Sequence, residues 1–373
     1  MSLDAIINRI NKKYGEGSVI KGAQLVSQKI ERVPTGSLAL DLTLGGGWPL
    51  NQWHEIIGEE SSGKTVLALK TIAKNQQLDP KYTAFWVAAE SLPMDWAQKL
   101  GVDLSRFLVH DTNVMEEAFD AVLEVLGSRE VDCVVVDSLP ALMPAVEEEQ
   151  AMADFAVGAH ARLTNKFTRK GHKETKRSLI EYDRPVLGIM INQWRSKIGV
   201  LHGDPRTTPG GLGKNYFFFT RSEVRRTDWL THPDLKDADS KPLRIGQRTA
   251  IRVFKNKSAA GQRKAEVDFY FADGGPVDAG SYDTFTDVVN IALATETVMR
   301  KGRTYYYEGE KLGVGRAEFE ERLREDTQLA DEISQKVLAG PKAPEPEKAA
   351  APVKKAVAKK APAKKRIVSK KSK

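Results

Sequence analysis

The segment Gly58-Glu59-Glu60-Ser61-Ser62-Gly63-Lys64-Thr65 is the most informative part of this 373-residue chain. It fits the pattern G-x-x-x-x-G-K-[ST] and lies between an apolar run at 54–57 and a helical pattern at 64–75. The glycines let the backbone close around phosphate oxygens, Lys64 can reach the β and γ phosphates, and the Thr65 hydroxyl can bind Mg²⁺. We therefore predict that residues 58–65 form a phosphate-binding loop; a glycine-rich turn without a ligand is the alternative.

Two acidic residues that follow apolar strands complete the predicted site. Asp137 follows Val134-Val135-Val136, and a carboxylate at the end of such a strand can accept a hydrogen bond from a metal-bound water. Glu90 follows the apolar run 84–89 and is the candidate that polarises an attacking water. Thr65 and Asp137 are thus candidate metal residues and Glu90 is a candidate catalytic residue. A solvated loop carboxylate is the other interpretation of Glu90.

Short apolar runs alternate with helical patterns from residue 54 to residue 191, which predicts βαβ units, an α/β fold class and a mostly parallel central sheet. The predicted strands are 54–57, 84–87, 107–109, 131–136 and 186–191. The predicted helices are 64–75, 94–100, 115–127 and 152–170. Apolar and polar residues alternate at 249–253 and 266–271, which favours antiparallel strands at one side of the sheet.

The patterns at the two ends of the chain differ from this central part. Apolar residues at helical spacing predict a short amphipathic helix over 3–14. Beyond residue 273, a helix at 284–294, a strand at 305–307 and a helix at 316–325 predict a small α+β domain. The predicted divisions are an N-terminal helix-strand oligomerisation arm at 1–34, the α/β core at 35–273, a C-terminal α+β domain at 274–340 and a tail at 341–373.

The composition excludes several classes of protein. Apolar residues make up 41% and charged residues 29%, which argues against global disorder. The single cysteine, Cys133, rules out an internal disulfide and a zinc site built on several thiolates. No apolar run approaches the roughly 18 residues that span a bilayer, and no basic segment at the start leads into a hydrophobic one. We expect a cytoplasmic protein without a membrane partner.

The net charge of +7 is concentrated in the tail at 341–373. This segment carries 11 Lys and 1 Arg against 2 Glu, so the first 340 residues carry about −3. Because it consists mostly of Ala, Pro, Lys and Val without aromatic residues, we expect it to be disordered. A basic arm of this kind can bind nucleic acid by counterion release, or it can serve only to keep the chain soluble.

A series of ordered motifs resembles the RecA family of DNA recombinases over roughly residues 5–337. They begin with Val33-Pro34-Thr35-Gly36-Ser37-Leu38-Ala39-Leu40-Asp41, Leu44-Gly45-Gly46-Gly47 and the phosphate loop. They continue with Ala88-Ala89-Glu90, Trp96-Ala97 and Lys99-Leu100-Gly101-Val102-Asp103. The later motifs are Ile191-Asn192-Gln193-Trp194-Arg195-Ser196-Lys197-Ile198-Gly199-Val200, Phe254-Lys255-Asn256-Lys257 and Tyr307-Glu308-Gly309-Glu310-Lys311-Leu312-Gly313.

The resemblance implies a RecA-like P-loop ATPase core and a function in recombination and DNA repair. A protein of this family uses ATP and Mg²⁺, forms a helical homo-oligomeric filament on single-stranded DNA, pairs it with double-stranded DNA and exchanges strands. A hexameric DNA helicase with the same core, or a regulatory DNA-binding ATPase, is the alternative. Electron microscopy separates a filament from a ring, since an interface that does not close gives an open helix.

The resemblance also implies roles for individual catalytic residues. Glu90 would polarise the attacking water, and Trp96 stands where the family stacks an aromatic ring on adenine. Gln193 resembles the residue that senses the γ-phosphate. Lys255 and Lys257 resemble a pair that a neighbouring subunit offers to the phosphates, where the cations would neutralise charge in the transition state.

Candidate DNA-binding residues come from two segments. Arg162 and Arg169 lie seven residues apart, which places them on one helix face, and they match cations near the family's first DNA loop. A solvated helix face is the other interpretation. The second loop supplies Arg195, Lys197, Arg206, Thr207, Thr208, Gly210 and Gly211. Because strand exchange must accept any sequence, we expect contacts with the phosphate backbone.

The sequence departs from the family pattern at several places. Glu59 replaces a usual proline, Asn215 replaces a lysine and Tyr216 replaces a phenylalanine. Lys214 is a candidate replacement for the missing loop cation. The segments 171–184 and 229–247 are longer than is typical, and the tail is basic where the family's is usually acidic. These differences indicate a divergent member, with a phage-encoded one as a possibility.

Overall fold

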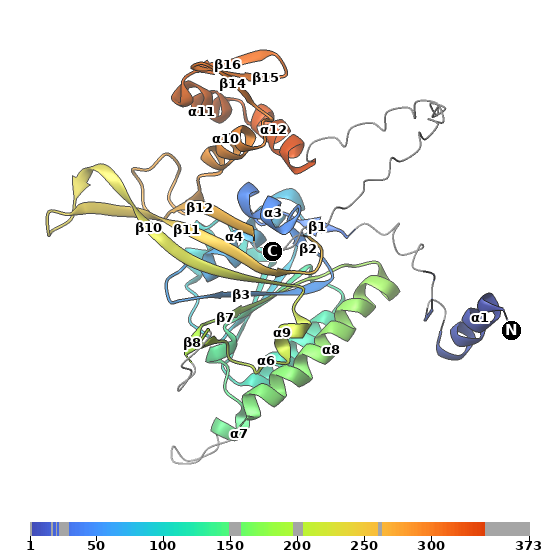
Figure 1. The fold of residues 1–373 in the computed structure, drawn as a ribbon. Helices are drawn as coiled ribbons and strands as arrows, with labels where there is room; N and C mark the ends of the chain where they lie inside the picture. The colour runs from blue at the N-terminus through green and yellow to red at the C-terminus, as the bar shows by residue number, and fades with distance from the viewer. Residues whose placement is uncertain are drawn as a thin grey trace, which may run out of the picture. The chain divides into compact units, whose positions relative to one another are not determined.

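The computed structural model describes residues 2–15, 18–19, 21, 30–148, 158–196, 204–259 and 263–339 (Figure 1). Lys197, the tail predicted at 341–373 and parts of the predicted N-terminal arm lie outside the described residues. The domain boundaries proposed from the sequence stay predictions. Within the described ranges, none of the helices is long and apolar enough to cross a membrane.

A nine-stranded sheet forms the centre of the molecule, in the order β13-β12-β11-β10-β3-β7-β6-β4-β5. The strands from β10 to β5 pair in parallel, whereas β10, β11, β12 and β13 pair antiparallel. The α/β fold and the mostly parallel sheet are therefore confirmed. The strand bounds are β3 Gln52–Gly58, β4 Ala84–Ala88, β5 Phe107–Asp111, β6 Cys133–Asp137, β7 Leu187–Asn192, β10 Thr220–Lys236, β11 Pro242–Asn256, β12 Arg263–Tyr270 and β13 Ser281–Tyr282.

Helices cover both faces of the inner parallel strands, which explains why β4 is apolar and buried along its whole length. In β4, Trp86 belongs to the core shared with α4 (Lys64–Leu78) and α5 (Met94–Lys99). Its neighbours Phe85 and Val87 belong to the opposite core with α6 (Met115–Ser128) and α8 (Ala159–Tyr182). The sheet is thus a rigid central layer, and its strand ends are held in fixed positions.

Helix α8 is longer than the sequence predicted. The expected helix ended at residue 170, but α8 continues through Gly171 to Tyr182, so most of the long segment 171–184 is helical. A tertiary contact holds this continuation, since Trp53 Nε1 donates to Thr175 Oγ1 at 3.0 Å. Within the helix, Thr175 Oγ1 donates to the Gly171 carbonyl at 2.6 Å. The predicted start at 152 lies outside the described residues, and α8 begins at Ala159.

The long segment 229–247 belongs to a hairpin formed by β10 and β11. Trp229 pairs with Gln247 in the antiparallel register, and Figure 1 shows the hairpin projecting beyond the sheet. The guanidinium groups of Arg226 and Arg244 lie 4.1 Å and 4.5 Å from the centre of the Trp229 ring. These cation–π contacts stiffen the part of the hairpin that leaves the sheet.

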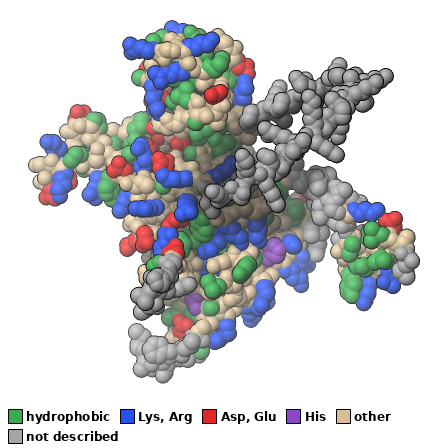
Figure 2. All heavy atoms as spheres, in the orientation of Figure 1, with side chains coloured by type: hydrophobic (Ala, Val, Ile, Leu, Met, Phe, Trp, Pro, Cys, Tyr) green, Lys and Arg blue, Asp and Glu red, His purple; other side chains and the backbone are tan. Residues whose placement is uncertain are grey.

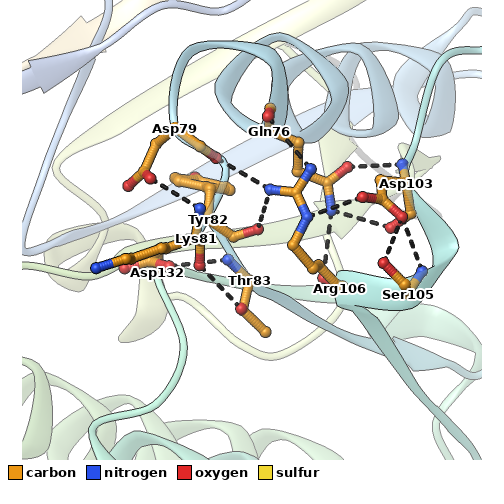
Figure 3. Close-up of polar contacts among 9 residues, drawn as sticks. All are labelled: Gln76, Asp79, Lys81, Tyr82, Thr83, Asp103, Ser105, Arg106 and Asp132. Carbon is orange, nitrogen blue, oxygen red and sulfur yellow. Dashed lines mark hydrogen bonds and ion pairs between the residues drawn. The ribbon is translucent and has the colours of Figure 1, made fainter.

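Polar contacts tie the amino ends of β4, β5 and β6 together (Figure 3). Arg106 donates to Asp103 Oδ2 at 2.8 Å and to the Asp79 carbonyl at 3.0 Å, just beyond the end of α4. The Thr83 amide donates to Asp132 Oδ2 at 2.8 Å. This network fixes the edge of the sheet opposite the phosphate loop.

The N-terminal helix α1 (Leu3–Tyr14) forms as expected. The Ser2 hydroxyl caps it by accepting a hydrogen bond from the Ala5 amide at 3.3 Å, and the helix ends at Gly15, whose φ is 106°. After α1, β1 (Arg32–Val33) pairs with β2 (Trp48–Pro49).

Gly15 suits the end of α1 because a residue without Cβ adopts positive φ at little cost.

The C-terminal part has its own apolar core, which includes Phe319, Leu323 and Ile333. Its elements are α10 Thr284–Ala294, β14 Met299–Lys301, β15 Thr304–Tyr307, β16 Glu310–Val314, α11 Arg316–Glu325 and α12 Thr327–Ala339. The sequence analysis did not predict α12 or the short helix α3 (Leu38–Leu44). Leu38 of α3 contributes to this core, and the Ser37 hydroxyl donates to Asp287 Oδ2 at 3.1 Å.

Candidate nucleotide site and DNA loops

The phosphate loop joins β3 to the amino end of α4. Gly63 caps α4 with φ 98°, and a Cβ there would lie 3.1 Å from Gln247 Nε2 of β11. Lys64 Nζ donates to the Glu59 carbonyl at 2.7 Å, and burial lowers the pKa of Lys64. The loop thus places a cation and the free amides of a helix N-terminus side by side, which is the arrangement that binds phosphate.

The predicted metal residues meet at the same place. Thr65 Oγ1 donates to Asp137 Oδ2 at 2.8 Å. Burial, together with the neighbouring Glu90 charge, raises the pKa of Asp137 to about 7. A hydroxyl and one carboxylate suit Mg²⁺, which takes hard oxygen ligands and completes its shell with waters and phosphate oxygens. Groups of three or more acidic, His or Cys residues that could hold a metal without a nucleotide are absent from the described part of the chain.

Glu90 lies beside this pair, just after β4. Its Oε1 accepts a hydrogen bond from Gln193 Nε2 at 3.4 Å and another from the Ser138 hydroxyl. The amides of Ala89 and Glu90 both donate to the Asp137 carbonyl, at 2.8 Å and 3.2 Å. The carboxyl ends of β3, β4, β6 and β7 therefore bring the phosphate loop, Glu90, Asp137 and Gln193 to one edge of the sheet, which is where ligands bind in such folds.

A cavity of about 420 Å³ opens at this edge. Residues 60–65 of the loop line it, and so do Glu90, Asp137 and Gln193. One wall is aromatic, because Trp96, Phe269 and Phe271 also line the cavity, with Trp96 and Phe269 edge-to-face at 6.3 Å between ring centroids. The sequence did not mark Gln247, Phe269 or Phe271 as site residues, since the alternation at 266–271 indicated only a strand; Phe269 lies in β12, and Phe271 lies just beyond its end.

The start and the end of the second DNA loop pair with each other. Strand β8 (Arg195–Ser196) is antiparallel to β9 (Arg206–Thr207), and residues 197–203 between them, including Lys197, lie outside the described residues. Arg206 lies over the Trp194 ring at 4.6 Å and forms an ion pair with Glu223 at 2.5 Å. Its hydrogen bonds with Asp204 and Glu223 raise the pKa of Arg206. Arg195 is exposed.

The end of this loop packs on helix α8. A Cβ at Gly211 would lie 3.1 Å from the Ala161 Cβ, and one at Gly210 would lie 3.0 Å from Thr164 Cγ2. Both glycines have positive φ, 93° for Gly210 and 75° for Gly211. The structure therefore brings the loop against the helix that carries Arg162 and Arg169, both of which are exposed. Figure 2 shows basic side chains along the part of this face where α8 lies.

Lys255 and Lys257 do not line the nucleotide cavity of their own chain. Lys255 Nζ donates to the Asn215 carbonyl at 2.5 Å, and Lys257 Nζ donates to the Tyr216 carbonyl at 3.1 Å. Burial, with the nearby Lys257 and Arg221 charges, lowers the pKa of Lys255 to about 8. Lys257 lines a second cavity, of about 730 Å³, together with Arg169, His172 and the exposed Tyr216.

Lys214 does not replace the missing loop cation in this structure. Its side chain is fully buried, and Nζ lies 2.5 Å from Glu55 Oε1. A side chain enclosed in this way cannot contact a DNA phosphate. The interpretation from the sequence was wrong here because burial depends on the partner at position 55, which is 159 residues away.

Fold and site together define a P-loop ATPase with a RecA-type core. The model of the RecA N-terminal domain matches residues 1–275, and the model of the RecA C-terminal domain matches residues 286–340. Protein RecA of Bacillus subtilis is 36% identical over 337 residues, 90% of each chain. Protein RecA of Thermus aquaticus is 36% identical over 343 residues, 90% of this chain and 93% of that one. Protein RecA of Enterococcus gallinarum is 35% identical over 338 residues, 90% of each.

The chain belongs to the RecA family of DNA recombinases. Membership implies DNA-dependent ATPase activity, the use of ATP with Mg²⁺, DNA binding and filament formation.

Proposed function

We propose that this chain hydrolyses ATP within a helical filament on single-stranded DNA and carries out homologous pairing and strand exchange. One observation supports this most directly. Gln193 contacts Glu90 at the nucleotide cavity, and two residues later the chain enters β8 of the second DNA loop. A change at the γ-phosphate can therefore reach the DNA loop through a segment of three residues, as in switches whose loops are ordered by a nucleotide.

Each side chain at the cavity has a task in hydrolysis. Lys64 binds the β and γ phosphates, and Thr65 with Asp137 holds Mg²⁺, which neutralises charge on the phosphates when bound. Glu90 orients the attacking water, and its exposed side chain suits that role; its charge is near enough to Asp137 to contribute to the raised pKa of that carboxyl. Phosphoryl transfer needs little more than such positioning and charge stabilisation.

Trp96, Phe269 and Phe271 bind the base and ribose end of the nucleotide in this proposal. They line the same cavity as the phosphate loop, and aromatic rings can stack on a nucleotide base without a charged group.

Lys255 and Lys257 act on the nucleotide of a neighbouring subunit. The support is that neither lysine lines the nucleotide cavity of its own chain, whereas Lys257 and Arg169 line a second cavity. Hydrolysis then requires an interface between two subunits, so isolated monomers turn over slowly.

DNA binds across α8 and the second loop through its phosphates. Arg162, Arg169 and Arg195 supply exposed cations, and Arg206 and Thr207 flank the loop. Lys197 is included from the sequence. Because these are backbone contacts, we expect little preference for base sequence and a steep salt dependence.

Two experiments test the proposal. Electron microscopy with single-stranded DNA and a slowly hydrolysed ATP analogue should show open helical filaments, whereas closed rings would support the hexameric helicase. A strand-exchange assay should then yield joint molecules with a homologous duplex but not with a heterologous one. Filaments without joint molecules would support the regulatory ATPase instead.

A further inference from the structure

A buried carboxylate lies on β3, three residues before the phosphate loop begins. Both Glu55 and Lys214 have fully buried side chains, which is rare for charged residues. Glu55 Oε1 accepts from Lys214 Nζ at 2.5 Å and from Asn192 Nδ2 at 2.8 Å, and Oε2 accepts from Arg221 Nε at 2.5 Å. Three donors from three different segments thus converge on one side chain.

The same three donors also bind the end of the second DNA loop. Lys214 Nζ donates to Thr208 Oγ1 at 2.7 Å, and Arg221 Nη2 reaches the same oxygen at 3.4 Å. Asn192 Nδ2 donates to the Pro209 carbonyl at 3.3 Å. Thr208 is itself buried, so its hydroxyl faces this network and not a DNA strand.

The network is connected to the nucleotide at two points. Glu55 belongs to β3, which runs without a break into Gly58 of the phosphate loop. Asn192 precedes Gln193, whose side chain contacts Glu90. In addition, the Gln193 amide donates to Asn192 Oδ1 at 2.9 Å. A shift of Gln193 therefore pulls on the residue that links Glu55 to Pro209.

Stability alone does not account for a buried ion pair. A protein in which apolar residues of similar volume replace such a pair is often equally stable. Removing a single partner, in contrast, leaves an uncompensated buried charge. What a fully bonded pair does supply is one defined geometry, because each donor has a fixed acceptor.

We propose that Glu55 and Lys214 are positioning residues that hold the second DNA loop in register with the phosphate loop, so that nucleotide binding and DNA binding strengthen each other. This inference rests on the proposed function. In the described arrangement the loop end is held by Lys214, Asn192 and Arg221, and this is the arrangement that the nucleotide-bound protein favours.

The test compares the affinity for single-stranded DNA with and without a slowly hydrolysed ATP analogue. The measured quantity is the ratio of the two dissociation constants for a fluorescent oligothymidylate, determined by anisotropy on the full chain. The variant is Glu55→Gln with Lys214→Met, which removes the charges of this pair at similar volume. Arg221 keeps its charge, and the new amide oxygen at position 55 can still accept its hydrogen bond. Since coupling between two sites typically spans about 5- to 150-fold, we expect the ratio to fall at least about fivefold.

The matched control is another ion pair between two elements, Arg129 and Glu174, which lie 3.3 Å apart with mostly buried side chains. Arg129→Gln with Glu174→Gln should leave the ratio unchanged. A double variant of Glu55 and Lys214 whose ratio stays within about twofold of the original would overturn the proposal. If the nucleotide has no effect on the DNA affinity of the unmodified protein, this inference fails. Joint molecules formed by that same protein would show that the proposed function still holds.

A second variant covers the case in which the double substitution prevents folding. Thr208→Val keeps the shape of the side chain and removes the hydroxyl that Lys214 and Arg221 bind, while Glu55 keeps all its donors. We expect the affinity ratio to fall here as well, while the protein stays folded, because Lys214 Nζ keeps Glu55 and Asn215 as acceptors. An unchanged ratio in a folded Thr208→Val protein contradicts the inference.

Discussion

Glu90 illustrates how much the chemistry depends on single side chains. It is exposed at the cavity, contacts Gln193 and Ser138, and lies next to the buried Asp137. Burial raises the pKa of Asp137, and a bound cation would favour its charged form. The two carboxylates thus suit different tasks, metal binding for Asp137 and water activation for Glu90.

Glu90→Gln should bind ATP normally and hydrolyse it slowly. The amide keeps the size of the side chain but cannot accept a proton, and loss of a general base typically costs about 10²- to 10⁴-fold in rate. ATPase assays with single-stranded DNA and binding of a fluorescent nucleotide measure the two effects separately. Lys64→Ala is the contrasting variant, because it should lose nucleotide binding itself. Turnover by Glu90→Gln at the normal rate would disprove the assigned role.

Asp287 should make the stability of the protein depend on pH. Burial, with the nearby Asp283 and Asp268 charges, raises the pKa of Asp287 to about 8, although the Ser37 hydroxyl opposes the shift. The folded state therefore holds the proton more tightly than the unfolded state. The resulting stabilisation is complete below the unfolded pKa, near pH 4, and is lost as the pH rises toward 8.

Asp287→Asn should remove this dependence, because the amide oxygen can still accept from Ser37 and never ionises. We expect its melting temperature to exceed that of the original protein by about 2 °C or more at pH 8.5, and the difference to shrink toward pH 5. Thermal unfolding across this range measures it. A difference that is the same at both pH values would contradict the assignment to Asp287.

At the scale of elements, the strand ends depend on contacts made at the far edge of the sheet. Arg106 joins the end of α4 to β5 through Asp103 and through the carbonyls of Gln76, Asp79 and Tyr82 (Figure 3). Cationic side chains suit the end of a helix, where backbone carbonyls lack partners. This contact holds β4 and α4 together without touching the nucleotide cavity.

Arg106→Ala should therefore lower stability without changing the chemistry. Removing the donor leaves several carbonyls without their partner, which we expect to cost about 1–3 kcal/mol. Denaturant unfolding measures the free energy, and the KM for ATP serves as the control because the cavity lies at the opposite edge. Arg106→Lys should recover part of the loss. Wild-type stability in Arg106→Ala would mean that water satisfies these carbonyls equally well.

At the scale of the whole molecule, the active site is complete only between two subunits if the proposal is right. Lys64 belongs to one subunit of each interface, and the lysine pair 255 and 257 belongs to the next. An interface of this head-to-tail kind repeats along a filament.

Mixed subunits test the shared site. Lys64→Ala protein and the double variant Lys255→Ala with Lys257→Ala should each be inactive alone. In an equal mixture, an interface regains both halves when the two proteins meet in the right order, so we expect up to about one quarter of normal ATPase activity. Either protein mixed with itself at the same concentration is the control. Activity that fails to recover in the mixture argues against a site shared between subunits.

The tail at 341–373 should strengthen the capture of duplex DNA. With a net charge of +10, it can release counterions from the phosphates, so its deletion should make the plot of log affinity against log salt less steep. Binding of a duplex at several salt concentrations measures the slope. An unchanged slope would leave the tail with a solubilising role only.

Local patterns in the sequence were sufficient for the phosphate loop, for the strands that lead to Glu90, Asp137 and Gln193, and for the helices between them. These features depend on residues within one strand, turn or helix, so their causes are visible along the chain. The resemblance to the family then assigned catalytic and DNA-binding roles to individual residues along the chain.

Contacts between distant segments decided the rest. Phe269 reaches the cavity through the pairing of β11 with β12, and the Phe271 amide just beyond β12 donates to the Ile245 carbonyl of β11. Helix α8 continues past Gly171, where Trp53 of a central strand binds Thr175. Lys214, a candidate replacement for the missing loop cation in the sequence, is buried against Glu55. The environment of a side chain depends on which strands pair and on what packs across them, and that information arises only when the whole sheet has formed.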